Sequence, residues 1–162
     1  MDPVNESDLD WTETAHGSAA FRRKKLAAAA GGDALGCSLY EVPPGGASWP
    51  YHYHAANEEA IYVLAGEGRL RTPDGERALE PGDYVACPIG EDGGHRVLVD
   101  EDADEPLRFL MTSTMRDTDV ARYPDSGKIG VFAGAPPGSE SERIVDGYFR
   151  EADDVDYWLD ES

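Results

Sequence analysis

The sequence predicts an all-β fold, and three features of the chain lead to that prediction. The 162 residues include 18 Gly and 11 Pro spread along the chain, which favours many short elements joined by turns. Between residues 36 and 115, short runs rich in β-branched and aromatic residues alternate with turn signals about every 8 to 12 residues. No long apolar stripe with the period of a helix appears in that range. These features indicate a single-domain β-sandwich or β-barrel.

The beginning of the chain is the least regular part of this prediction. Residues 1–20 are polar and acidic, and we expect them to form a flexible arm. Residues 21–30 are ambiguous, because their Ala and Lys content favours a helix but the stretch is short and lacks an apolar stripe. We place the β-barrel at residues 21–115, so that it includes this ambiguous stretch.

Turn signals divide the predicted barrel into strands. Residues 73–75 (Pro-Asp-Gly) and 80–83 (Glu-Pro-Gly-Asp) are turns of the kind that join neighbouring strands. Residues 116–162 are less regular, and we expect a C-terminal extension that packs on the same domain. The expected strands cover residues 36–42, 49–54, 60–64, 69–72, 84–87, 95–99 and 107–115.

The charge balance argues against one class of partner. There are 33 Asp and Glu against 14 Lys and Arg, which gives a net charge of −19. Nucleic-acid binding needs a basic surface, so we expect no nucleic-acid partner. The one basic run, residues 22–25, is predicted to be a solvated strand face.

The net charge also suggests the salt concentration in which the protein functions. Acid excess together with only three lysines favours a protein from a halophile, because at about 1 M salt the Debye length is about 3 Å and surface carboxylates scarcely repel one another. An acidic surface that merely aids solubility is the alternative. Thermal unfolding at the same temperature in dilute buffer and in molar salt would contradict the halophile interpretation.

The compartment is predicted from what the sequence lacks. The first residues do not show the basic start and apolar run of a signal peptide, and no apolar stretch approaches the roughly 20 residues that cross a bilayer. Cys37 and Cys87 are too few for a disulfide framework and are expected to be two buried, reduced thiols. We therefore expect a cytoplasmic protein with no membrane contact.

Three of the four histidines fall within the predicted barrel. His52 and His54 are two apart, so on a strand both imidazoles point to the same face. Glu59 follows after a short turn and could return beside them, whereas His95 must arrive through the fold. Three imidazoles and a carboxylate suit Fe, Mn, Ni or Zn, which the sequence does not distinguish. The alternative is a set of hydrogen-bonded packing histidines, the class to which we assign His16.

Two motifs carry a resemblance to a known family. The first reads Gly46-ASWPY-His52-Tyr-His54-AANE-Glu59-AIYVLA-Gly66, and its spacing is that of the first cupin motif. The second reads Gly82-DYVAC-Pro88-Ile-Gly90-EDGG-His95, and it resembles the second cupin motif with a longer loop before the histidine and Val99 in place of the usual Asn. The resemblance implies a jelly roll, also called a double-stranded β-helix. It also implies that His52, His54, Glu59 and His95 are the ligands of one divalent metal ion.

The C-terminal region carries a further resemblance. Residues 123–132 and the tail with Tyr157 and Trp158 are similar to a group of small single-domain cupins, many of them labelled only as uncharacterised or oxalate-decarboxylase-like. That group supplies no activity. The resemblance therefore adds to the expected fold and leaves the reaction open.

Strand parity gives expectations for the residues around the histidines. If His52 and His54 face the barrel interior, then Trp49, Tyr51 and Tyr53 face away and form either packing or a homodimer interface. Ile61 and Val63 share the parity of Glu59 and are expected to form apolar walls of the pocket. Four residues whose faces stay open are candidate substrate contacts: Tyr40, Arg69, Arg71 and Tyr84.

Several functions remain open. The first is a metal-dependent enzyme, such as a dioxygenase, decarboxylase or isomerase, on a small carboxylate, phenol or sugar-type substrate. The sequence shows no separate catalytic base or nucleophile, and no cofactor besides the metal is expected. The alternative is a non-catalytic binding module or sensor that acts through a partner, and a purely structural metal site is a third hypothesis. An imidazole must be neutral to bind a metal ion. Metal should therefore be lost as the pH falls below the unperturbed His pKa of about 6.5, displaced downward by the affinity for the metal.

Overall fold

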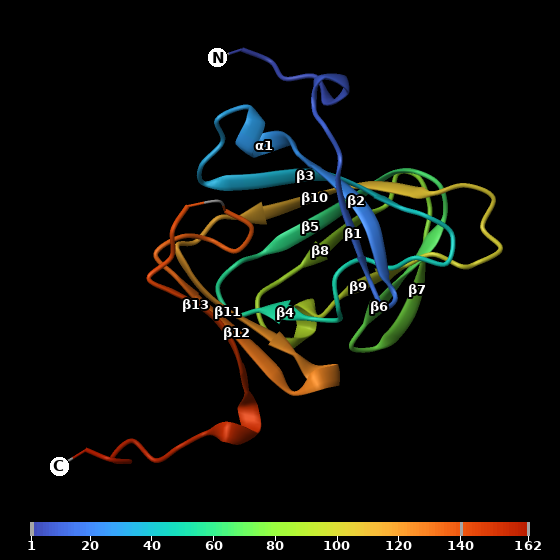
Figure 1. Ribbon diagram of the computed structural model, residues 1–162. Coiled ribbons are helices and arrows are strands. Elements are labelled where there is room, and N and C mark those ends of the chain that lie inside the picture. The colour runs from blue at the N-terminus through green and yellow to red at the C-terminus, as the bar shows by residue number, and fades with distance from the viewer. Residues whose placement is uncertain (1, 140, 162) are drawn as a thin grey trace.

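The computed structural model describes residues 2–139 and 141–161, and its strands form antiparallel sheets that close into a jelly roll, as predicted (Figure 1). The helical elements are short, of three or four residues each. The strands are β1 (Thr12–His16), β2 (Ala19–Lys25), β3 (Leu35–Val42), β4 (Tyr53–His54), β5 (Glu59–Ala65), β6 (Gly68–Thr72), β7 (Gly75–Leu79), β8 (Tyr84–Cys87), β9 (Arg96–Leu98), β10 (Leu107–Thr114), β11 (Thr118–Tyr123), β12 (Lys128–Ala133) and β13 (Val145–Arg150). The helical turns are η1 (Glu6–Asp8), α1 (Leu26–Ala29), η2 (Glu91–Gly93), η3 (Pro124–Ser126) and η4 (Glu151–Asp153).

Three sheets surround the core. Their strand orders are β1-β2-β3-β10-β5-β8, β7-β6-β9 and β13-β12-β11-β4. Side chains alternate between the two faces of each strand, which is clear in β5: Ile61 and Val63 are buried, whereas Tyr62 and Leu64 are exposed. The parity expected for Ile61 and Val63 is therefore confirmed, and both belong to the apolar core.

The beginning of the chain contains more regular structure than a flexible arm. β1 lies within residues 1–20 and pairs along its whole length with β2, so this stretch is part of the six-stranded sheet. The ambiguous stretch 21–30 divides, with strand to Lys25 and then the single turn of α1. Pairing with β2 holds β1 in place, although most of its side chains are exposed.

The C-terminal extension is joined to the strand that carries His54. β11 pairs with β4, with Ala121 opposite His54 and Arg122 opposite Tyr53. β12 and β13 continue that sheet outward, and the last residues run away from the body of the molecule (Figure 1). Within residues 2–139 and 141–161, no helix has the length and apolar character needed to cross a membrane.

The aromatic stripe predicted beside the histidines packs within the chain at two of its three positions. Tyr51 and Tyr53 are buried, while Trp49 keeps 37% of its surface exposed. The ring of Trp49 contacts Phe21 edge to face at a centroid distance of 4.6 Å. The stripe thus contributes to packing, and the expected homodimer stays a prediction.

Candidate metal centre

Backbone pairing brings His52 and His95 together. An isolated β-bridge joins the two residues, with the His95 amide donating to the His52 carbonyl at 3.0 Å. The residues that lengthen the second motif form the turn η2, which ends just before His95. The longer loop is thus taken up by a turn of 3-10 helix, and the ring centroids of His52 and His95 lie 4.8 Å apart.

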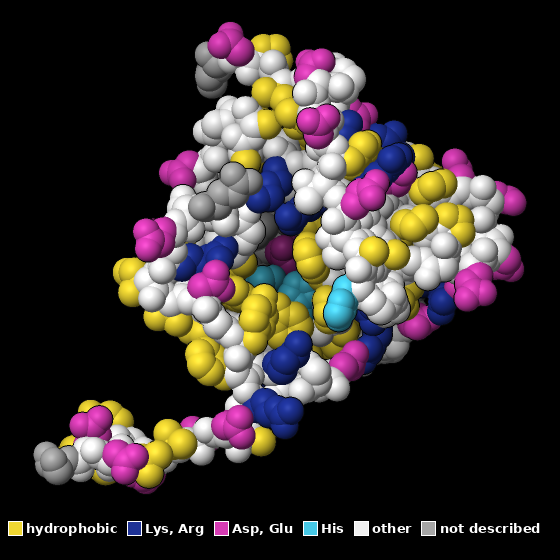
Figure 2. Space-filling model, in the orientation of Figure 1, with side chains coloured by type: hydrophobic (Ala, Val, Ile, Leu, Met, Phe, Trp, Pro, Cys, Tyr) yellow, Lys and Arg dark blue, Asp and Glu magenta, His cyan; other side chains and the backbone are white. Residues whose placement is uncertain are grey.

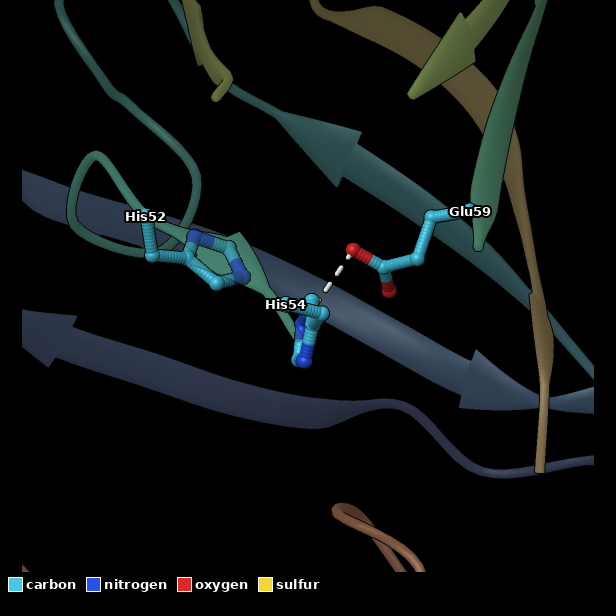
Figure 3. Close-up of side chains that lie close together, drawn as sticks. All are labelled: His52, His54 and Glu59. Carbon is cyan, nitrogen blue, oxygen red and sulfur yellow. Dashed lines mark ion pairs between the residues drawn. The ribbon is translucent and has the colours of Figure 1, made fainter. Parts of the chain in front are cut away.

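Glu59 is the point at which the cluster converges. It is the first residue of β5, and its Oε2 lies 3.4 Å from His54 Nε2 and 3.3 Å from His95 Nε2. His52, His54 and Glu59 offer ligand atoms that all lie within 4.8 Å of one another (Figure 3). Two ligands held about 2.1 Å from one ion lie roughly 3.0 Å apart at a right angle and roughly 3.4 Å apart at the tetrahedral angle. The observed N–O separations fall within that range.

All three imidazoles are anchored through Nδ1. His52 Nδ1 donates to the Pro50 carbonyl at 2.8 Å, and His95 Nδ1 donates to the Gly93 carbonyl at 2.9 Å. A carbonyl oxygen can only accept, so Nδ1 carries the proton and the Nε2 lone pair of the neutral ring is available. His54 Nδ1 lies 2.5 Å from Asp119 Oδ2. This arrangement orients metal-binding histidines in many proteins.

Two atoms in the centre of the cluster have no hydrogen-bond partner. Glu59 Oε2 and His95 Nε2 are buried, and neither makes a hydrogen bond within the part of the chain that the structure describes. Leaving a buried polar atom without a partner costs about 1–3 kcal/mol, and more when the group is charged. A cation bound between them would satisfy both atoms, so the residues present fit a divalent metal.

The electrostatics of the cluster follow from burial and close contact. Burial would raise the pKa of Glu59, but the close imidazoles of His54 and His95 outweigh it and hold that pKa well below its usual range. Burial, reinforced by the neighbouring His95, lowers the pKa of His52 to about 3. Burial opposes protonation of His54 too, yet its contacts with Asp119 and Glu59 raise its pKa to about 9. Contacts with Cys87 and Glu59 likewise overcome burial and raise the pKa of His95.

Asp119 is a candidate functional residue that the sequence did not reveal. It lies on β11, is 1% exposed, and accepts hydrogen bonds from His54 Nδ1, the Ala56 amide and Asn57 Nδ2. Asn57 Oδ1 in turn accepts from the Arg116 amide. Because the carboxylate that accepts from His54 belongs to β11, the orientation of the His54 ring depends on the C-terminal extension.

A cavity of about 800 Å³ opens beside the cluster. His54, Asn57 and Glu59 line one end, and residues of β2, β3 and the loop 134–139 line the other. Figure 2 shows this hollow, with histidine and acidic side chains inside it and basic side chains at its edge. A small molecule that entered the cavity would reach the same carboxylate and imidazole that converge in the cluster.

The four candidate substrate contacts do not share one location. Tyr40 is buried and lines the cavity. Arg69 pairs with Glu76 and with a second carboxylate at the surface, and Arg71 likewise pairs with Asp125. The side chain of Tyr84 is exposed. Tyr40 is therefore the one of the four that the structure brings to the cavity, and His16 lies exposed on β1.

Comparisons with known proteins agree with this architecture. The family model described as the Cupin domain matches residues 38–113. A candidate sugar phosphate isomerase from Acidithiobacillus ferrooxidans is 28% identical, with a TM-score of 0.77 over 92% of this chain and 90% of that chain. A sugar phosphate isomerase from a cupin superfamily of Silicibacter pomeroyi has a TM-score of 0.79 over 94% of both chains, but at 22% identity it shows the fold alone.

A more distant enzyme shares the barrel. The polyketide cyclase RemF from Streptomyces resistomycificus is 28% identical, with a TM-score of 0.60 over 70% of this chain and 79% of that chain. A comparison with curated proteins found no significant match. The structures that resemble this chain at 28% identity thus carry names with different activities.

Proposed function

We propose that this chain, which carries a domain of the cupin superfamily at residues 38–113, is an enzyme that uses one divalent metal ion to act on a small organic substrate. The proposed ligands are His52, His54, Glu59 and His95. The substrate would bind in the adjacent cavity of about 800 Å³, whose lining includes two of those ligands.

One observation supports the metal more than any other. Two imidazole Nε2 atoms, from His54 and His95, lie 3.4 and 3.3 Å from the same carboxylate oxygen of Glu59, and that oxygen makes no hydrogen bond within the described residues. Packing histidines normally satisfy such atoms with each other or with backbone groups. The Nδ1 anchors of all three rings point the remaining lone pairs inward, which suits metal ligation better than packing.

Different residues of the chain would orient the metal ligands and exclude water from the site. A bound divalent metal supplies Lewis acidity, which polarises an oxygen that ligates it. His52 and His95 keep their Nδ1 protons on backbone carbonyls, and Asp119 orients His54. Ile61 and Val63, 0% and 1% exposed, exclude water from the barrel interior behind Glu59. Such a low-dielectric environment strengthens electrostatic interactions with a bound substrate.

The names of the similar structures favour catalysis over ligand binding without turnover. The two structures at 28% identity have the names of an isomerase candidate and a cyclase, and both names describe turnover of a small organic compound. Because the two reactions differ, we take from them only the general class of function. Tight binding of a metabolite without turnover would instead favour a binding module or sensor.

Metal analysis followed by a substrate screen tests this proposal. We expect about one divalent ion per chain, lost in His52→Ala and kept in His16→Ala, which removes an exposed histidine from β1. The iron, manganese, nickel and zinc forms should then be screened in air against small acids, phenols and sugar phosphates. Metal content unchanged in His52→Ala would refute the ligand assignment, and inactivity of all four forms would count against an enzyme.

A further inference from the structure

The basic run at residues 22–25 divides between the two faces of β2, because successive side chains of a strand point to opposite sides. Arg22 and Lys24 lie on one face, each 4.5 Å from the ring centroid of Trp11. Arg23 and Lys25 lie on the other face, are partly buried, and line the cavity. The expectation of a solvated strand face is therefore corrected: Lys24 is buried, and Arg23 and Lys25 face the candidate site.

The strand register places these two cations on the same interior face as Glu59. Directly opposed residues of antiparallel strands point to one face, so rows of residues can be followed from β2 to β5. The rows are Arg23–Tyr40–Phe109–Val63, then Lys25–Ser38–Met111–Ile61, and then Gly36–Ser113–Glu59. Lys25 and Glu59 therefore lie in adjacent rows, on strands separated by three spacings of about 4.8 Å.

The surface between Lys25 and Glu59 is lined by three small residues and Met111. Gly36, Ser38, Ser113 and Met111 occupy the positions between Glu59 and Lys25, and all four line the cavity. Backbones roughly 14 Å apart, with long side chains projecting from both ends, leave room for a small molecule and little more. A ligand that spans this floor would contact Glu59 and its metal at one end and a cation at the other.

Arg23 is held in place without a carboxylate partner. Its Nη1 donates to Tyr40 Oη at 3.3 Å, and its guanidinium lies 5.6 Å from the ring centroid of Trp49. Tyr40 Oη also accepts from Trp49 Nε1 at 3.0 Å, which leaves the phenol proton available to a ligand. In the part of the chain described, Arg23 has no ion pair, although six other arginines pair with carboxylates: Arg22, Arg69, Arg71, Arg108, Arg122 and Arg143.

Three of the acidic side chains that line the cavity are more exposed than these cations. Asp10, Asp33 and Asp117 are exposed, whereas Arg23 and Lys25 are partly buried. Lys25 Nζ also donates to the Gly138 carbonyl at 3.0 Å, which ties β2 to the loop 134–139. An anion inside the cavity would thus be close to cations that are less exposed than these three carboxylates.

We propose that Arg23 and Lys25 bind the anionic group, a carboxylate or a phosphate, of the small substrate whose other end reaches the metal centre. This inference rests on the proposed function, because it assigns the substrate class of that same site. A guanidinium matches both groups with paired hydrogen bonds, and charge-assisted bonds of this kind are about twice as strong as neutral ones. The Tyr40 hydroxyl would donate to the same anion.

Three compounds with one hydroxylated skeleton test the inference: glycerol 3-phosphate, glycerate and glycerol. Their dissociation constants should be measured by calorimetry at fixed ionic strength, on protein of known metal content and again after chelation. We expect at least one of the two anions to bind and glycerol to bind at least tenfold more weakly. The anion that binds more tightly identifies the carboxylate or the phosphate class. Failure of both anions to bind would overturn the inference.

Matched variants distinguish the effect of a cation that faces the cavity from the effect of the net charge of the protein. Arg23→Gln and Lys25→Gln should each weaken anion binding by about tenfold or more, while Arg22→Gln, which removes the same charge from the opposite face, should change it less than twofold. Equal losses in Arg22→Gln and Arg23→Gln would contradict the assignment. Circular dichroism checks folding, and Arg23→Lys should recover part of the affinity if charge matters. Arg23-dependent anion binding by a protein that takes up no metal would support this inference while refuting the proposed metal site.

Discussion

His52 and His54 are two residues apart, yet their pKa values are shifted in opposite directions. On the His52 side, the ring is anchored to the Pro50 carbonyl and its pKa is lowered to about 3, mainly by burial. On the His54 side, the ring is anchored to Asp119, and contacts with Asp119 and Glu59 outweigh burial and raise its pKa to about 9. A backbone carbonyl orients an imidazole without adding charge, whereas a carboxylate also makes it more basic.

The difference shows how the metal centre depends on the rest of the chain. The His52 side is built from residues that are near in sequence or joined by the bridge to His95. The His54 side is completed from β11, in the C-terminal extension, which pairs with β4. The extension therefore contributes to the chemistry of the centre, and both sides can be tested separately.

The largest expected effect is that of pH on metal binding. At pH 7 the metal-free protein carries an additional proton on His54, whose pKa is raised to about 9, so a metal ion must displace that proton. Apparent metal affinity should rise by about tenfold per pH unit for each proton displaced, up to about pH 9 at His54. Calorimetry in buffers of different ionisation enthalpy measures the protons released. Release of no protons at pH 7 would contradict the difference between the two sides.

The stability of the metal-free protein should show the opposite trend. A histidine whose pKa rises on folding stabilises the protein fully below its unfolded pKa of about 6.5, and this contribution is lost as the pH rises through the folded value. For His54 the loss should therefore extend from pH 6.5 through about 9. Urea unfolding of chelator-treated protein across this interval measures the trend.

Removal of the carboxylate anchor should have the next largest effect. Asp119→Asn keeps the shape but places an amide where the carboxylate accepts from His54, Ala56 and Asn57. We expect metal affinity to fall 10- to 100-fold, because loss of such an anchor misorients the ligand ring and lowers its basicity. Competition with a chromophoric chelator measures the affinity.

Asp125→Asn is the matched control for Asp119→Asn. It removes a carboxylate that is paired with Arg71 at the surface, and metal affinity should be unchanged. Unchanged affinity in Asp119→Asn as well would mean that the His54 side needs no carboxylate. The two sides of the centre would then be equivalent in function.

The sequence could predict the barrel and the convergence of four side chains, but not the anchor. His52 and His54 share a face because of strand spacing, and the motif spacing pointed to Glu59 and His95. Asp119 is one of 33 acidic residues, and nothing local distinguishes it, since its burial depends on β11 reaching β4. Whether the cluster holds metal stays a prediction.

Two other features depend on long-range pairing and were missed for the same reason. β1 has little apolar character, and its pairing with β2 cannot be seen in its own residues. The basic run on β2 was expected to be solvated, because a charged strand usually lies at a surface. Only the order of strands in the sheet places Arg23 and Lys25 over an interior cavity.

The smallest expected effect concerns packing on the His52 side. The ring of Tyr123 stacks on that of His52, with centroids 5.7 Å apart and planes inclined by 14°. Tyr123→Leu removes this stacking and leaves the Nδ1 bond to Pro50 in place, so metal affinity should fall about two- to tenfold. The same chelator competition measures it. Tyr123→Phe keeps the ring and should match the wild type, since on this side contact with the ring, and not a hydrogen bond from its hydroxyl, supports the orientation. An equal loss in Tyr123→Phe would show that the Tyr123 hydroxyl, and not ring stacking, supports the His52 side.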